Sequence, residues 1–273
     1  MTSKIPKAEP LVFMPNLVED NKIIHKGIFS PGYKKYFYTE SKSDFTKFNI
    51  LEIQKTDNKW TAPREAFINS EFDDHGMSFS PDGNFLYFSS TRPIEIEGIP
   101  DTWHIWSSEK INHKWSKPKF VDIPNMRNKL VSHPSISNSG KIYFHSSNLD
   151  YSEMMIYSSE IKNGKFQDAR IVHFTEDLNF QKCTPFISPN ENYLIFAEIH
   201  QDQLKLKISF KDQADKWTKP KELSKSINIG GQGNPFVTPD ERFLFFTKMD
   251  NHNKEGYGSW NVNWVDIKQE LSN

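Results

Sequence analysis

Short apolar runs alternate with short polar runs along this chain, and the same order of runs recurs five times. In each copy an apolar stretch ends in Ser or Thr, turn-forming residues follow, and a second apolar stretch rich in aromatic residues comes next. The spacings between the hydroxyl residues are 50, 57, 51 and 50 residues, and these residues are Ser30, Ser80, Ser137, Ser188 and Thr238. A period near 50 residues predicts a propeller, solenoid or similar repeat array.

The fourth copy shows what one repeat contains. Residues 184–188 form a short apolar strand, and Ser188-Pro189-Asn190 has turn chemistry, since Pro presets φ and Asn tolerates the left-handed region. Residues 193–197 form an aromatic and branched second strand, and residues 204–208 alternate as a half-exposed third strand does. Trp217 begins a fourth strand that contains Pro220, which is tolerated at a sheet edge. Four antiparallel strands make one propeller blade.

The two ends of the chain complement each other. The fifth repeat stops after its third strand at residues 261–265, whereas residues 10–14 precede the first repeat where the other repeats have a fourth strand. We therefore predict an all-β fold, a five-bladed β-propeller of four-stranded antiparallel blades, closed by the N-terminal strand joining the C-terminal blade. Closure removes exposed sheet edges. One propeller domain would fill residues 1–273, with residues 1–9 and 267–273 at its periphery.

One copy is close to a known repeat pattern. Residues 77–90 read Met-Ser-Phe-Ser-Pro-Asp-Gly-Asn-Phe-Leu-Tyr-Phe-Ser-Ser. This resembles the TolB-like, WD-related propeller repeats of bacteria, whose pattern is Pro-x-h-Ser-Pro-Asp-Gly-x-x-h-h-Phe-x-Ser with h apolar. The resemblance extends over residues 24–265, although the first, third and fourth repeats depart from Ser-Pro-Asp-Gly. It implies a scaffold that contacts protein, peptide or glycan, often at the cell envelope.

Composition restricts the classes of partner. The formal charge of −1 gives no global field for nucleic acid or an anionic membrane, and no run of about 18 apolar residues could span a bilayer. Cys183 is alone, so no intrachain disulfide can form. The N-terminus lacks the apolar core of a signal peptide, so we expect a cytoplasmic protein if the chain is complete, and a periplasmic or envelope protein if a signal segment was removed. We expect a monomer.

The two faces of the predicted disc differ in loop length. Tight Ser-Pro-Asp-Gly turns occupy one face, the Ser-Pro face. The opposite face, the long-loop face, has the connections at residues 91–102, 148–153, 200–203 and 250–259, and the connections between blades that end at Lys26, Gly76, His133, Thr184 and Asn234. Long loops on one face of a repeat scaffold are the usual binding surface. We therefore place the ligand on the long-loop face.

Equivalent repeat positions define rings at the channel mouth on this face. Four residues before the hydroxyls lie Lys26, Gly76, His133, Thr184 and Asn234, and five before lie His25, His75, Ser132, Cys183 and Gly233. These rings could cap loops and hold channel water, or contact ligand. Trp, Tyr and Arg dominate binding hot spots, and Tyr151 and Tyr257 lie on the same loops. The candidate ligand-binding residues are His25, Lys26, His75, Arg92, Trp103, His133, Lys182, Asn234, Lys248 and Trp260.

A catalytic alternative rests on a third ring, two residues beyond the last aromatic residue of each second strand. It consists of Glu40, Ser90, Ser146, Glu198 and Lys248. Glycosidases use pairs of carboxylates, and five-bladed propellers also host arabinanase-type sites, so a glycoside hydrolase or lyase with Glu40, Glu198 and Asp74 is the alternative. That argument is an analogy of fold alone. A charge cluster in which Lys248 lies between the two glutamates explains the same residues.

Other chemistries leave no motif in the sequence. There is no Gly-x-Ser-x-Gly, phosphate loop or dinucleotide fingerprint, so we favour a non-catalytic binding propeller without a cofactor. None of the nine histidines has the spacing of a zinc motif. His25, His75 and His133 come from adjacent blades and could ligate a divalent metal, with Asp73 or Asp74 in support. Alternatively, these histidines form hydrogen bonds between adjacent blades.

Overall fold

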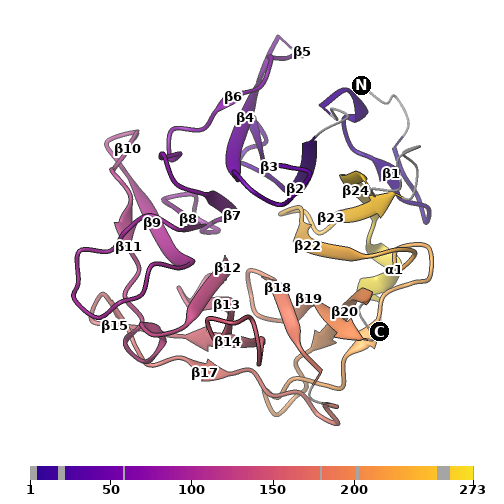
Figure 1. Cartoon of the computed structure of the whole chain (residues 1–273). Helices are drawn as coiled ribbons and strands as arrows, with labels where there is room; N and C mark the ends of the chain where they lie inside the picture. The colour runs from indigo at the N-terminus through magenta and orange to yellow at the C-terminus, as the bar shows by residue number, and fades with distance from the viewer. Residues whose placement is uncertain are drawn as a thin grey trace.

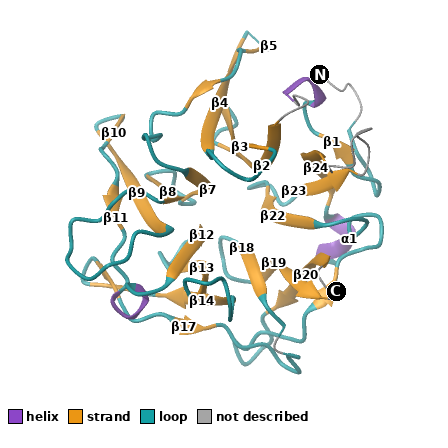
Figure 2. Ribbon diagram, viewed as in Figure 1, coloured by secondary structure: helices purple, strands orange, loops and turns teal. Residues whose placement is uncertain are grey.

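The computed structural model describes residues 5–17, 22–57, 59–178, 180–200, 203–250 and 259–272. Five antiparallel sheets stand around a central axis like the blades of a propeller (Figure 1), and the helices are short peripheral turns (Figure 2). The predicted five-bladed all-β propeller is confirmed. No helix in the described ranges is long and apolar enough to cross a membrane.

The first three strands of each blade are the regular part of the fold. The first strands lie nearest the axis and are β2 (Lys22–Phe29), β7 (Asp74–Phe79), β12 (Leu130–Ile136), β18 (Lys182–Ile187) and β22 (Gln232–Val237). The second strands are β3 (Lys35–Lys42), β8 (Phe85–Ser90), β13 (Ile142–Ser147), β19 (Tyr193–His200) and β23 (Phe243–Asp250). The third strands are β4 (Asn49–Thr56), β9 (His104–Ile111), β14 (Met155–Ser159), β20 (Gln203–Phe210) and β24 (Ser259–Asp266).

The outer strands are short and interrupted. In blade 1, β5 (Lys59–Trp60) and β6 (Arg64–Glu65) both pair with β4, on either side of Pro63, which has no N–H for the ladder. The equivalent pieces of the other blades are β10 (Lys114–Trp115), β11 (Lys119–Phe120), β16 (Lys165–Phe166), β17 (Arg170–Ile171) and β21 (Lys221–Glu222), and β16 pairs with β15 (Ile161–Lys162), which follows the third strand β14. The single outer strand that the sequence predicted is thus divided. The helical turns are η1 (Pro15–Leu17), η2 (Pro124–Met126) and α1 (Lys268–Leu271).

The N-terminal strand closes the ring as predicted. β1 (Leu11–Val12) pairs with β24, with Leu11 opposite Trp264, and the Phe13 N–H donates to the Val262 carbonyl at 2.8 Å. The Phe13 ring lies 5.0 Å from the Phe245 ring of blade 5 and 4.9 Å from the Tyr36 ring of blade 1. The N-terminal segment therefore completes blade 5 and also fills the junction with blade 1.

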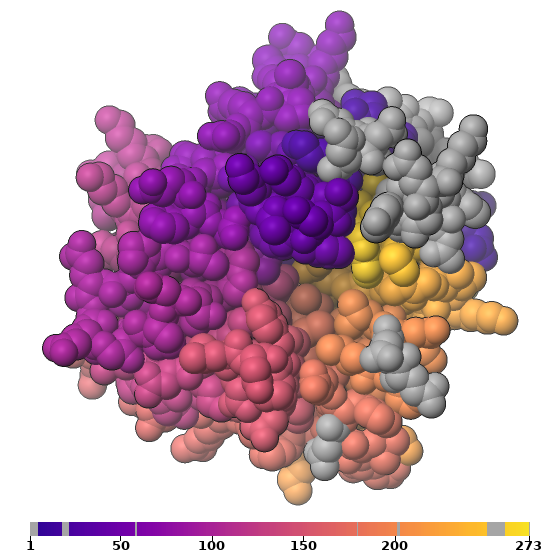
Figure 3. Space-filling view, in the orientation of Figure 1, coloured from indigo at the N-terminus to yellow at the C-terminus, as the bar shows by residue number. Residues whose placement is uncertain are grey.

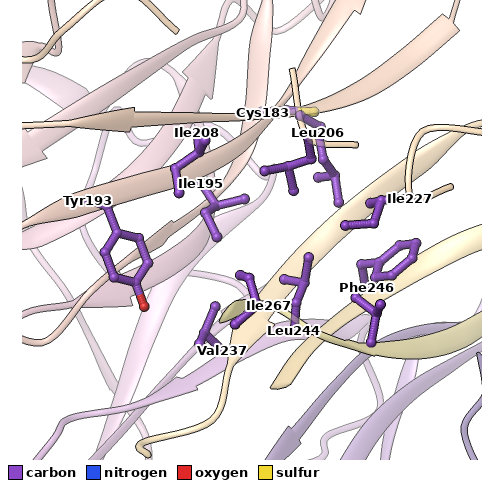
Figure 4. Packing of buried hydrophobic residues seen from close by; sticks show 13 residues of the cluster. Cys183, Tyr193, Ile195, Leu206, Ile208, Ile227, Val237, Leu244, Phe246 and Ile267 are labelled. Atoms are coloured by element: carbon purple, nitrogen blue, oxygen red, sulfur yellow. The ribbon is translucent and has the colours of Figure 1, made fainter. Parts of the chain in front are cut away.

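Apolar clusters between adjacent blades make the core. Figure 4 shows one such cluster, between blades 4 and 5, formed by Ile195, Leu206, Ile208, Val237, Leu244 and Phe246 among others. Cys183 belongs to the same cluster, and burial raises the pKa of its thiol to about 12. A thiol held in the neutral form is a small apolar side chain rather than a nucleophile. Packing between sheets therefore accounts for the only cysteine of the chain.

Candidate functional site

Every first strand carries a β-bulge at the same repeat position. The pairing of β2 with β3 shifts between Ile24 and Gly27, and the first strands of the other four blades shift at the equivalent point. A bulge inserts one residue into a strand and changes the direction of its side chains. The bulges contain Lys26, Gly76, His133, Thr184 and Asn234, which we call the bulge ring. Its members were predicted to end the connections between blades, and this is wrong because they lie inside the first strands.

Four of the five bulge-ring residues adopt the left-handed backbone conformation, with φ between 47° and 63°: Gly76, His133, Thr184 and Asn234. This conformation is unfavourable for side chains with a Cβ, and most of all for a β-branched residue such as Thr184. Hydrogen bonds to their N–H groups compensate. His133 donates to Ser89 Oγ at 2.9 Å, and Thr184 donates to His145 Nδ1 at 3.2 Å. The strained positions are thus held by groups from the adjacent blade.

Histidine and aromatic side chains gather at the long-loop end of the channel. The His75 ring lies 4.1 Å from the Trp103 ring and 4.5 Å from the His133 ring, measured between centroids. His133 in turn stacks on His145 at 4.8 Å, and Phe48 lies 5.3 Å from His75. We call this continuous group the imidazole–aromatic arc, and its members are His25, Phe45, Phe48, His75, Trp103, His133 and His145.

Burial keeps the imidazoles of the arc uncharged. It lowers the pKa of His25 to about 4 and that of His145 to about 3. The pKa values of His75 and His133 are held well below the ordinary range, first by burial and then by neighbouring positive charge. A neutral imidazole both donates and accepts hydrogen bonds, and Ser132 Oγ lies 3.0 Å from both His75 Nε2 and His133 Nδ1. The arc is therefore an uncharged, hydrogen-bonded aromatic surface.

The three histidines of the metal alternative do not converge. Across the described ranges no group of three or more His, Cys, Asp and Glu side chains is arranged to hold a metal ion. His25 Nε2 lies 2.8 Å from Ser41 Oγ instead, and its ring contacts Phe48 at 5.1 Å. His75 and His133 share Ser132. The geometry therefore gives the His25, His75 and His133 metal site no support.

The glutamates of the catalytic alternative are engaged in separate ion pairs. Glu40 pairs with Lys22 of its own blade, and Glu198 pairs with Lys207 of its own blade at 2.6 Å. The side chain of Glu198 is only 4% exposed. Lys248 takes part in neither pair, so the expected cluster of one lysine between two glutamates does not form.

Two predicted ligand-binding cations are inside ion pairs as well. Arg92 Nη2 lies 2.7 Å from Asp74 Oδ1, and the Arg92 side chain is 12% exposed. The other oxygen of Asp74 accepts from the Ser70 N–H and hydroxyl. Lys182 Nζ lies 2.8 Å from Asp177 Oδ1, and its side chain is fully buried. These cations hold connections between blades, and both carboxylate oxygens of Asp74 are engaged.

The remaining predicted residues lie apart from the arc. Asn234 Nδ2 donates to Thr247 Oγ1 at 3.3 Å, and Lys248 lies opposite Gln232 in the ladder of blade 5. Trp260 packs over Gly231, where a Cβ would lie 3.0 Å from the indole. Tyr151 is 58% exposed on the connection between β13 and β14, and Tyr257 lies outside the described residues. The structure thus unites His25, His75, Trp103 and His133, places Lys26 within electrostatic reach of His75 and His133, and separates Arg92, Lys182, Lys248 and Trp260 from them.

His145, Phe45 and Phe48 are the members of the arc that the sequence analysis missed. His145 belongs to a fourth ring, one residue beyond the last aromatic residue of each second strand, made of Thr39, Ser89, His145, Ala197 and Thr247. Ser89 and His145 accept the bulge N–H of the next blade. Reading one more repeat position would have found this ring. The two phenylalanines have no repeat equivalent and left no signal.

The Ser-Pro end of the channel is apolar. A cavity of about 90 Å³ opens there, lined by all five blades, with Phe29, Phe79, Ile136, Phe186 and Phe236 among its walls. Its lining residues include no charged side chain. Figure 3 shows no open hole at the centre of the disc, in keeping with a channel filled by side chains. The two ends of the channel therefore offer different chemistry.

Comparison with known proteins identifies the fold. No protein-family model and no curated protein matches the sequence. A putative TolB from Agrobacterium tumefaciens matches with a TM-score of 0.53 and 15% identity, over 90% of this chain and 78% of that chain. An α-L-arabinofuranosidase from Podospora anserina, in complex with cellotriose, matches with a TM-score of 0.54 and 13% identity, over 95% and 97%. A chain of a nidogen/laminin complex gives 0.52 and 12%, over 84% and 70%. At these identities the likeness shows a shared propeller fold and no more.

Proposed function

We propose that this chain is a non-catalytic binding propeller that holds a neutral glycan on the imidazole–aromatic arc. The observation that carries the proposal is the set of ring contacts among Phe48, His75 and Trp103 at the mouth of the channel. Phe45 extends this set to the solvent, with half of its surface exposed. Aromatic rings present an apolar face with a weakly negative quadrupole, on which the C–H groups of a sugar ring can stack.

The charge state of the arc favours an uncharged ligand. Its imidazoles are neutral, and among the described residues it contains no ion pair. Neutral imidazole and hydroxyl groups can donate to and accept from sugar hydroxyls. An acidic or basic peptide would find no opposite charge within the arc itself. A neutral glycan therefore fits this surface better than a charged peptide does.

The carboxylates argue against hydrolysis. Glycosidases need two carboxyl groups that face the substrate, one of them protonated. Glu40, Glu198 and Asp74 instead lie in three separate ion pairs, with Lys22, Lys207 and Arg92. The fold itself does not discriminate, since a putative TolB and an arabinofuranosidase both share it.

A glycan array followed by titration tests the proposal. Trp103→Ala and Phe45→Ala should each weaken binding of a selected neutral glycan at least about tenfold, the scale of a hot-spot residue. The matched control is Phe67→Ala, because Phe67 is also exposed but stacks on Trp115 away from the arc. Equal losses in all three variants, or an array with no binder, would overturn the proposal. Turnover of arabinan or a chromogenic glycoside that disappears in Glu40→Gln or Glu198→Gln would establish the hydrolase alternative.

A further inference from the structure

Two lysines are buried in the described part of the chain, and they differ in their partners. Lys182 bonds to Asp177 and to the Phe180 carbonyl, both at 2.8 Å. Lys26, with an exposed fraction of 3%, has no ion pair and no hydrogen bond from its ammonium group to any described residue. Burying an unpaired ammonium is strongly unfavourable, and burial lowers the pKa of Lys26 to about 7, so a counter-ion would favour its charged form. Among the residues that the structure describes, none supplies a counter-ion to Lys26.

Lys26 lies in the innermost strand of blade 1. It is the bulge-ring residue of blade 1, and its charge acts on His75 of blade 2 and on His133 and His145 of blade 3. Its ammonium group therefore lies within electrostatic reach of groups from three blades. None of these three neighbours is a carboxylate, so the described groups that Lys26 acts on are neutral imidazoles.

Several polar groups around Lys26 have unused hydrogen-bonding capacity. His145 accepts the Thr184 N–H at Nδ1, so its own proton lies on Nε2 and remains available to donate. The bulge-ring amide of Asn234 in the adjacent blade 5 has a buried oxygen with no hydrogen-bond partner in the described chain; as an acceptor, it can bind a water or a protonated phosphate hydroxyl but not an ionised oxygen. Buried polar groups of this kind are normally satisfied by water or by a ligand.

We propose that the channel binds one small oxyanion, a phosphate or a carboxylate group, against Lys26 at the level of the bulge ring. Ammonium–oxyanion hydrogen bonds are among the strong ones in proteins, and the N–H groups of neutral imidazoles add further donors. The partly exposed rings of His25 and His75 mark the long-loop side as the route of entry. The anion is either a free ion or the acidic group of a larger ligand. This site does not depend on the glycan proposal, which rests on the outer rings of the arc.

Equilibrium dialysis with radiolabelled inorganic phosphate at constant ionic strength tests the site. We expect one phosphate per chain for the full-length protein and at least a tenfold loss of affinity in Lys26→Met, which keeps the length of the side chain and removes its charge. The matched control is Lys225→Met, since Lys225 is exposed and distant from the channel. Acetate and trigalacturonate, used as competitors, distinguish a free ion from the acidic group of an oligosaccharide. Phosphate uptake that is absent, or equal in Lys26→Met and the control, would overturn the proposal.

A second measurement needs no variant. Crystals of the full chain soaked in selenate should give an anomalous peak within about 4 Å of Lys26 Nζ, because the charged hydrogen bond joins Nζ to a selenate oxygen and the selenium lies one bond further away. A selenate peak only at surface lysines would contradict the channel site. The glycan proposal stands or falls separately, because it predicts loss of binding in Trp103→Ala and not in Lys26→Met.

Discussion

The two ends of the central channel are built by the same five strands, yet their chemistry differs. At the Ser-Pro end, Phe29, Phe79, Phe186 and Phe236 surround an apolar cavity. At the long-loop end, one cation, one imidazole, one hydroxyl, one amide and one glycine make up the bulge ring. The first set is repetitive and the second has a different residue in each blade. We infer that the repetitive end preserves the fold, whereas the varied end carries the function.

The hydrogen bonds at the Ser-Pro end explain its repetition. Ser80 Oγ accepts the Phe85 N–H at 2.9 Å, and Ser188 Oγ accepts the Tyr193 N–H at 3.0 Å. Ser30 and Thr238 accept from the equivalent residues of their own blades. Each hydroxyl thus joins the turn to the start of the second strand. This local hydrogen bond recurs in blades 1, 2, 4 and 5, whereas Ser137 of blade 3 donates to Glu191 Oε1 at 2.8 Å, so the hydroxyl positions are explained by structure and do not indicate a ligand.

Among the substitutions considered, one at Gly27, in the first strand of blade 1, should have the largest effect on stability. A Cβ at Gly27 would lie 1.9 Å from the hydroxyl oxygen of Tyr36, which is fully buried. We expect Gly27→Ala to lower the free energy of unfolding by about 3 kcal/mol or more, the upper range for overpacking. Gly32→Ala is the control, because that glycine has no atom within 4 Å and only its φ of 81° opposes a side chain. Urea unfolding that gives equal losses for both variants would contradict this account.

Acid should weaken the long-loop end selectively. The folded-state pKa values of His25 and His145, about 4 and about 3, lie below the value of about 6.5 in an unfolded chain. Between these values the unfolded chain binds more protons, so stability is complete above about pH 6.5 and falls as the pH drops towards 4.

The expected slope for each such histidine is about 1.4 kcal/mol per pH unit. His25→Phe should reduce the slope, whereas His113→Gln, at an exposed turn, should leave it unchanged. Chemical unfolding at pH 7, 6 and 5 measures it. A stability that is flat over this range would refute the neutral, buried state of the arc.

Smaller effects should separate stability from binding. Phe186 at the Ser-Pro end is half-buried, so Phe186→Ala should cost about 2 kcal/mol, below the range for a fully buried ring, and leave glycan affinity unchanged. Trp103→Ala should cost about as much stability, because Trp103 is also half-buried, but it should in addition weaken glycan binding. Thermal unfolding and titration calorimetry on the same samples give both numbers. If Phe186→Ala also abolished binding, the two ends would not be independent.

The features that the sequence predicted are those encoded locally. Alternation, the turn at Ser80-Pro81-Asp82-Gly83 and the missing fourth strand of the last repeat give the five blades and their closure by Leu11 and Val12. The bulges were not predicted, because one extra residue in a strand does not disturb its apolar pattern enough to be seen. Because of these bulges, Lys26 and His133 lie in first strands and not in the connections between blades where we expected them.

Repeat equivalence pointed to the histidines of the candidate site, whereas Trp103 was chosen for its residue type on a long loop. His25 and His75 were found because both lie five residues before a hydroxyl. Arg92 and Lys182 were assigned to the ligand because their partners, Asp74 and Asp177, become neighbours only through the path of the connections between blades. Such contacts depend on loop conformation, which has no periodic signature.

The most direct test of the central claim is a titration followed through the side chains of the seven tryptophans. In a spectrum of ¹⁵N-labelled indole groups, addition of the array-selected glycan should shift the Trp103 resonance. Trp60 and Trp115 should not move, because they contact Phe29 and Phe79 at the Ser-Pro end. A shift of Trp60 or Trp115 with an unchanged Trp103 would place the ligand on the opposite face and contradict the account.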